Sequence, residues 1–116
     1  MANRASTRNM QTIRFVIDAN ASAAPVVYTV DQNVEVCEIR TLTGAAVAFV
    51  LTVRNGANQI ATVTSAGVAN DVDAALSMDP ARIDIAAGGT ITVQTSDPGA
   101  RCLVTIFVLP GVTATS

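Results

Sequence analysis

The sequence contains no histidine, no lysine and no tryptophan, and it has only two cysteines. Without histidine, the residue that most often moves protons at neutral pH, neither a Ser-His-Asp nor a Cys-His arrangement can be built. Two distant cysteines do not make a zinc site, because zinc is held by clusters of Cys and His. We therefore predict that the protein is not an enzyme and has no catalytic residue, cofactor or metal ion.

Aromatic side chains are also scarce, since Tyr28 is the only tyrosine and three phenylalanines complete the set. Binding of carbohydrate or single-stranded nucleic acid usually needs aromatic rings on which sugars or bases stack. The seven basic residues are all arginines scattered singly along the chain, and the net charge is −2. These features predict that nucleic acid is not a partner.

No apolar run is long enough for a membrane helix, and the first residues, MANRASTRNMQ, lack the apolar segment of a signal peptide. We expect a protein made in the cytoplasm, with no membrane partner. Under those conditions Cys37 and Cys102 are expected to be small buried hydrophobic residues. Pairing between two strands is geometrically possible, so a disulfide stays open.

The acidic residues cluster only once, as Asp71, Asp73, Asp79 and Asp84. Calcium takes six to eight oxygen ligands, and these carboxylates could supply some of them. The spacing matches no known calcium loop, so we expect solvated residues on loops and outer faces.

Half of the residues are hydrophobic, and short β-branched runs alternate with turn residues. Residues 12–18 alternate cleanly, and the pairs Asn55-Gly56 and Pro98-Gly99 are turn signals. The pattern predicts an all-β fold: an antiparallel, jelly-roll-like β-sandwich of 8–9 short strands with at most one short helix. We expect a flexible N-terminal arm (1–11), the sandwich domain (12–110) and a short C-terminal tail (111–116).

Two hairpins are predicted in detail. Residues 83–109 would fold around Pro98-Gly99, which places Ile91 opposite Ile106 and Val93 opposite Val104 on one buried face. A longer loop remains open there, because a Pro-Gly turn matches hairpin twist poorly. Asn55-Gly56 would place Leu51 opposite Ile60.

Two other segments are irregular. The buried parity switches between Val36 and Cys37, which predicts a β-bulge. Residues 65–79 fit a helical stripe and also period-2 alternation of Val72, Ala74, Leu76 and Met78. We favour a loop followed by a strand, because the rest of the chain is uniformly β.

Some apolar side chains fall on faces that a single sandwich would leave in water. We predict that they form the interface of a homo-oligomer. The residues are Ala46, Ala48 and Val50 on one strand and Leu103 and Phe107 on another.

The polar N-terminal arm carries Arg4 and Arg8. It is either a disordered terminus or an arm that orders on a partner surface, and both interpretations stand.

The segments IAAGGTITVQTSD and ARCLVTIFVLPG, after a polar arm and alternating strands, resemble the small jelly-roll structural proteins of tailed-bacteriophage virions. The closest type is the capsid decoration (cement) proteins and head-fibre bases. The resemblance implies trimers on the outer capsid surface that stabilise the shell, with the major capsid protein as partner. Arg4 and Arg8 would then dock the arm on the shell. The alternatives are another virion component (tail, neck or fibre base) or a carbohydrate-binding β-sandwich module.

Overall fold

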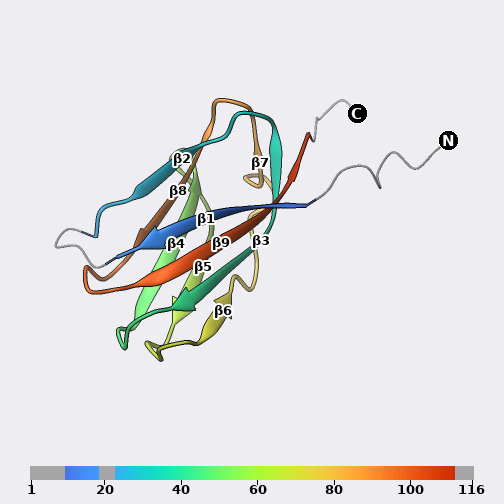
Figure 1. The fold of residues 1–116 in the computed structure, drawn as a ribbon. Coiled ribbons are helices and arrows are strands. Elements are labelled where there is room, and N and C mark those ends of the chain that lie inside the picture. Colours follow the sequence, from blue (N-terminus) through green and yellow to red (C-terminus); the bar gives the residue numbers. More distant parts are fainter. Residues whose placement is uncertain (1–9, 19–22, 112–116) are drawn as a thin grey trace.

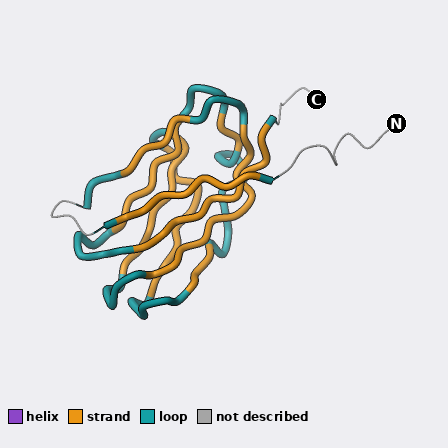
Figure 2. Tube along the Cα trace, in the orientation of Figure 1, coloured by secondary structure: helices purple, strands orange, loops and turns teal. Residues whose placement is uncertain are grey.

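The computed structural model describes residues 10–18 and 23–111, which form two antiparallel β-sheets packed into a sandwich (Figure 1). This part of the chain contains strands and loops but no helix (Figure 2). The all-β antiparallel sandwich is therefore confirmed. Its strands are β1 (Gln11–Ile17), β2 (Val26–Thr29), β3 (Val34–Thr43), β4 (Phe49–Asn55), β5 (Asn58–Ser65), β6 (Val72–Ala74), β7 (Asp84–Ile85), β8 (Thr90–Thr95) and β9 (Cys102–Pro110).

The strand order is that of a jelly roll. One sheet runs β1-β9-β3-β6, with β7 paired to β3, and the other runs β2-β8-β4-β5. The pairings are nested along the chain: β4 with β5, β3 with β6 and β7, β2 with β8, and β1 with β9. The chain is thus one long antiparallel ribbon rolled into two sheets.

The core lies between the two inner faces and is built almost entirely from aliphatic side chains. Its largest fully buried members include Ile39, Leu51, Ile85, Ile91 and Ile106. Each buried side chain of this size stabilises the fold by roughly 1.5–3 kcal/mol. Strand β1 shows the underlying pattern, because Phe15 and Ile17 are buried while Arg14 and Val16 are exposed.

The predicted β-bulge is present in β3. Val36 lies opposite Val108 and Glu38 lies opposite Phe107, so Cys37 is the extra residue. The bulge lets both Val36 and Ile39 point into the core despite the change of parity.

The predicted hairpin of residues 83–109 is wrong in its pairing. Strand β8 pairs with β2 and β4, whereas β9 pairs with β1 and β3 in the other sheet. A turn does form, in which Ala100 N donates to Asp97 O (3.1 Å) and Gly99 N to Asp97 Oδ1 (2.7 Å). This turn carries the chain between the sheets, as its poor match to hairpin twist allows.

The expected buried face of that segment is nevertheless correct. Ile91, Val93, Val104 and Ile106 are all fully buried. They belong to the inner faces of two different sheets, so they contribute to one core without forming one ladder.

The β4–β5 hairpin forms, but Leu51 lies opposite Val63 and not Ile60. The two-residue loop is Gly56-Ala57, one position later than expected, and the register shifts again between Val53 and Arg54. Gly56 has φ +60°, which suits the first central position of a type II′ turn.

Strand β4 begins at Phe49, so the predicted strand positions Ala46 and Ala48 lie in the preceding loop.

Within residues 65–79 a loop is followed by a short strand, as favoured. The strand covers only Val72–Ala74, and the alternating apolar residues Val72 and Leu76 are 63% and 100% exposed. Beyond it, Ala75 N donates to Ile39 O (3.1 Å) and Asp79 N donates to Ile60 O (2.9 Å). Those two bonds draw the segment across the side of the sandwich, from one sheet to the other, so the alternation does not continue.

Candidate functional site

The residues predicted to form one oligomer interface are divided between the two sides of the sandwich. Val50 lies on the outer face of β4, and Leu103 and Phe107 lie on the outer face of β9, in the other sheet. Ala46 and Ala48 are exposed in the loop before β4. The structure therefore does not bring these five residues into one patch. Arg4 and Arg8 lie outside the described residues.

Leu103 is part of an aliphatic row that crosses the whole outer face of its sheet. The register places Val16 of β1 beside Leu103, Leu103 beside Leu42 of β3, and Leu42 beside Val72 of β6. Val16 is 70% exposed, Leu42 39% and Val72 63%. Side chains directly opposite in neighbouring strands lie about 5 Å apart, so the four form a continuous apolar surface, which we call the aliphatic row.

Polar residues bound the aliphatic row on both sides. On one side of the row, the outward-facing residues two positions farther along the four strands also lie side by side. They are Arg14, Thr105, Arg40 and Ala74. In the other direction lie Asp18, Arg101, Gly44 and Asn70, where Gly44 N donates to Arg101 O (2.7 Å) and Asn70 N to Thr43 O (2.8 Å). A shallow hollow of about 270 Å³ is lined by Asp18, Gly44, Asn70, Arg101 and three members of the aliphatic row. Asp18 and Arg101 therefore lie on the same outer surface as the aliphatic row.

Arg40 is held on the side away from the aliphatic row. Its Nε donates to the Glu38 carboxylate, and its guanidinium carbon lies 5.4 Å from the centre of the Phe107 ring. Glu38 of β3 and Phe107 of β9 lie directly opposite each other. Each is two residues farther from the aliphatic row than Arg40 and Thr105 are. Phe107, predicted as an interface residue, is thus covered in part by Arg40 of its own chain.

The predicted interface did not include Val16, Leu42 or Val72. A signal existed for two of them, since Val16 and Leu42 occupy the outward parity of their strands between or beside charged residues. Val72 carried a misleading signal, because an apolar residue that alternates with Asp73 is typical of an inward position.

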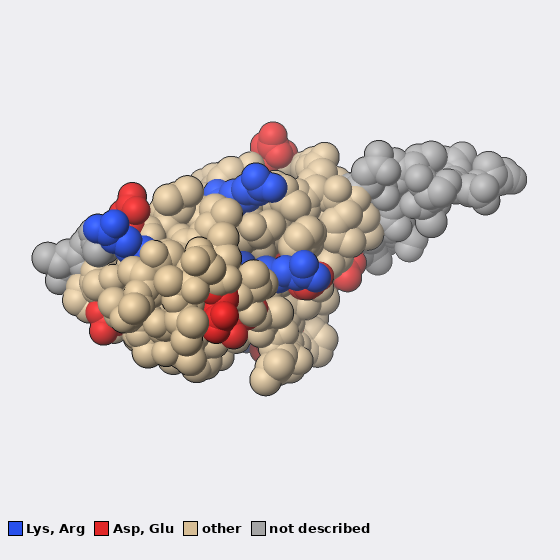
Figure 3. Space-filling model, turned by 60° about the horizontal axis from the view of Figure 1, so that its bottom comes forward, with Lys and Arg blue, Asp and Glu red and all other residues tan. Residues whose placement is uncertain are grey.

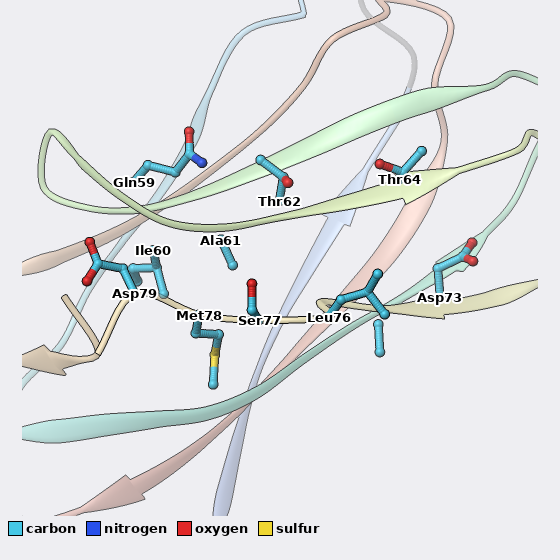
Figure 4. Close-up of a pocket in the computed structure, with 11 residues that line it drawn as sticks. Gln59, Ile60, Ala61, Thr62, Thr64, Asp73, Leu76, Ser77, Met78 and Asp79 are labelled. Atoms are coloured by element: carbon cyan, nitrogen blue, oxygen red, sulfur yellow. The ribbon is translucent and has the colours of Figure 1, made fainter. Parts of the chain in front are cut away.

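A groove of about 780 Å³ runs along the open edge of β5. Figure 4 shows Gln59, Thr62 and Thr64 of β5 on one side of the groove. On the other side lie Leu76, Ser77 and Met78, in the segment after β6 that passes from one sheet to the other. Asp73 and Asp79 lie at opposite ends of it in the close-up. Asp79 already accepts a hydrogen bond from Ala81 N (2.9 Å) and lies 3.9 Å from Arg82. None of the described residues that line the groove is aromatic, so these residues offer no platform for stacking a sugar.

The acidic residues and the thiols are also dispersed. In residues 10–18 and 23–111 no three or more carboxylates or thiols gather as a metal site would require. Both cysteines are free thiols. Burial, together with the Glu35 carboxylate, raises the pKa of Cys37, and burial raises the pKa of Cys102 to about 11. Both thiols are therefore mostly protonated at neutral pH and are weak nucleophiles.

Basic side chains lie apart from one another on the face shown in Figure 3. No helix of the described chain is long and apolar enough to cross a membrane. Comparison with protein-family models, with curated proteins and with solved structures finds no match to this chain.

Proposed function

We propose that this protein is a non-enzymatic structural protein of a bacteriophage virion, which binds the outer capsid surface and stabilises the shell. The observation that carries the proposal is the aliphatic row on the outer face of the β1-β9-β3-β6 sheet. Exposed contiguous aliphatic side chains, bordered by polar ones, are typical of surfaces that associate with protein. A rigid sandwich with such a surface suits a building block better than a catalyst.

The jelly-roll topology supports the proposal by analogy. Rolled double sheets of this kind recur in viral capsid proteins and in lectins. A fold alone does not assign a function. The carbohydrate-binding alternative is disfavoured by the β5 groove, because none of the described residues that line it is aromatic.

The arrangement of the ends suits attachment to a shell. Strand β1 begins opposite Val108, near the end of β9, whereas Val16 of the aliphatic row lies opposite Leu103, near its start. About 20 Å of strand thus separates Met10 from the row. The arm before Met10 and the row are available for different contacts, with Arg4 and Arg8 pairing with acidic groups on the shell. Many identical weak contacts on a lattice give strong attachment overall.

Co-sedimentation with purified shells tests this function. Full-length protein is expected to pellet with shells, and a variant lacking residues 1–9 is expected to stay in the supernatant. A matched variant lacking residues 112–116 serves as the control and should bind like the full chain. If full-length protein does not bind shells, the capsid proposal is wrong; if the arm deletion binds equally well, the arm has no docking role.

A further inference from the structure

We propose that the aliphatic row is a two-fold interface between two copies of this chain, with the symmetry axis lying along the row. The partner of this surface is thus a second copy, packed sheet against sheet. This inference goes beyond the proposed function, because it assigns the row to contact between copies and leaves contact with the shell to the N-terminal arm.

A two-fold interface must be complementary to itself, because the same patch is used on both copies. A straight row of aliphatic side chains meets this requirement, since rotation about an axis along it brings each member against its own equivalent. Val16 then meets Val16, Leu103 meets Leu103, and Leu42 and Val72 do likewise. Water is removed from the most exposed aliphatic positions of the sheet.

The charged residues on either side of the aliphatic row favour one orientation of the two-fold axis over another. Rotation about the row moves the line of Arg14 onto the line of Asp18, because these lie two residues to either side of Val16 on β1. Arg14 of each copy then faces Asp18 of the other, which gives two reciprocal ion pairs. In the same arrangement Thr105 faces Arg101 and Ala74 faces Asn70.

An axis parallel to the strands through the middle of the sheet, between β9 and β3, produces no such match. It would exchange β1 with β6 and β9 with β3, so Arg14 would face Ala74 and Asp18 would face Asn70. Of these two axes, only the one along the row pairs opposite charges.

Two further arginines flank the row, and one of them, Arg101, faces Thr105 of the second copy and lies beside Asp18 of its own chain. Arg40 faces Gly44 of the second copy, and its guanidinium is drawn away from the row by Glu38 and Phe107. Neither Arg14 nor Asp18 forms an ion pair with another described residue of its own chain. Both are free to pair across the interface.

Sedimentation-equilibrium mass measurements on the purified full-length protein, at up to about 100 µM and in low salt, test this interface. Wild-type protein is expected to be a dimer. Arg14→Asp or Asp18→Arg alone places like charges together at both symmetric positions and should weaken the dimer by at least about tenfold. The double variant R14D/D18R exchanges the two charges and should restore the dimer.

Two controls separate this result from misfolding and from the capsid proposal. Val50→Asp, on the outer face of the other sheet, should leave the dimer intact, whereas Val16→Asp should abolish it; circular dichroism checks that each variant folds. A wild-type monomer, a trimer, or a double variant that stays monomeric would overturn the inference. Shell binding by the same variants is measured separately, so failure of one proposal does not mimic failure of the other.

Discussion

Thr41 and Thr43 are buried two residues apart on the inner face of β3, yet their hydroxyl groups have different surroundings. Thr43 Oγ1 lies 2.8 Å from Ser65 Oγ of β5, so this hydrogen bond joins the two sheets. Thr41 Oγ1 is buried with no hydrogen-bond partner among the described residues. An unpaired buried hydroxyl destabilises the folded state, whereas a paired one does not.

Substitution with valine, which has the same shape, is therefore expected to act in opposite directions at these two positions. Thr41→Val should stabilise the protein by about 1 kcal/mol, and Thr43→Val should destabilise it by about 1–2 kcal/mol. Urea unfolding of the two variants beside the wild type measures both changes. A loss of stability in Thr41→Val comparable to that in Thr43→Val would mean that the Thr41 hydroxyl has a partner after all.

Sequence alone placed residues on faces well but could not identify such pairs. Alternation located the inward positions of β1 and β3, including the change of parity at Cys37. The bond from Thr43 to Ser65 depends on how β3 and β5 approach across the core, and alternation contains no information on that approach.

Among the elements, two glycine turns differ in what surrounds them. Gly56, in the β4–β5 turn, has φ +60° and nothing within 4 Å of an added Cβ. Gly67 has φ +82°, and an added Cβ would lie 2.5 Å from the backbone nitrogen of Ala48 in the β3–β4 loop. At Gly56 the backbone requires only the positive φ that glycine adopts easily. At Gly67 the absence of a side chain also allows two loops to pack closely.

We expect Gly56→Ala to cost about 1 kcal/mol, which is the usual penalty of a left-handed backbone for an L-residue. Gly67→Ala should cost clearly more, because backbone atoms of the β3–β4 loop must move. Thermal unfolding midpoints of the two variants provide the comparison. Equal midpoints would show that the two loops are not packed closely.

The elements also show why strand existence was predicted better than strand pairing. Apolar alternation and turn residues are local signals, and they located eight to nine strands. Pairing depends on turn twist and on the order in which strands enter the sheets. The Asp97–Ala100 turn therefore connects β8 and β9 across the sandwich, although local residue types favoured a hairpin.

In the whole molecule, the aliphatic row exists only because the topology places β1, β9, β3 and β6 side by side. Its members come from four separate parts of the sequence, and each alone is an ordinary exposed aliphatic residue. Face parity predicted Leu103 as an interface residue, but it could not predict sheet membership, so Leu103 was grouped with Val50 of the other sheet. The trimer implied by the resemblance stays a competing prediction, which the mass measurement decides.

The most direct test of the structural role is a cryo-EM map of purified shells incubated with this protein. The account predicts added density on the outer capsid surface, into which this sandwich fits, with copies paired through their β1-β9-β3-β6 sheets. Shells that show no added outer density at saturating protein would contradict the account. Density for this fold in the tail or neck of an intact virion would likewise contradict it, and would assign the protein to another part of the particle.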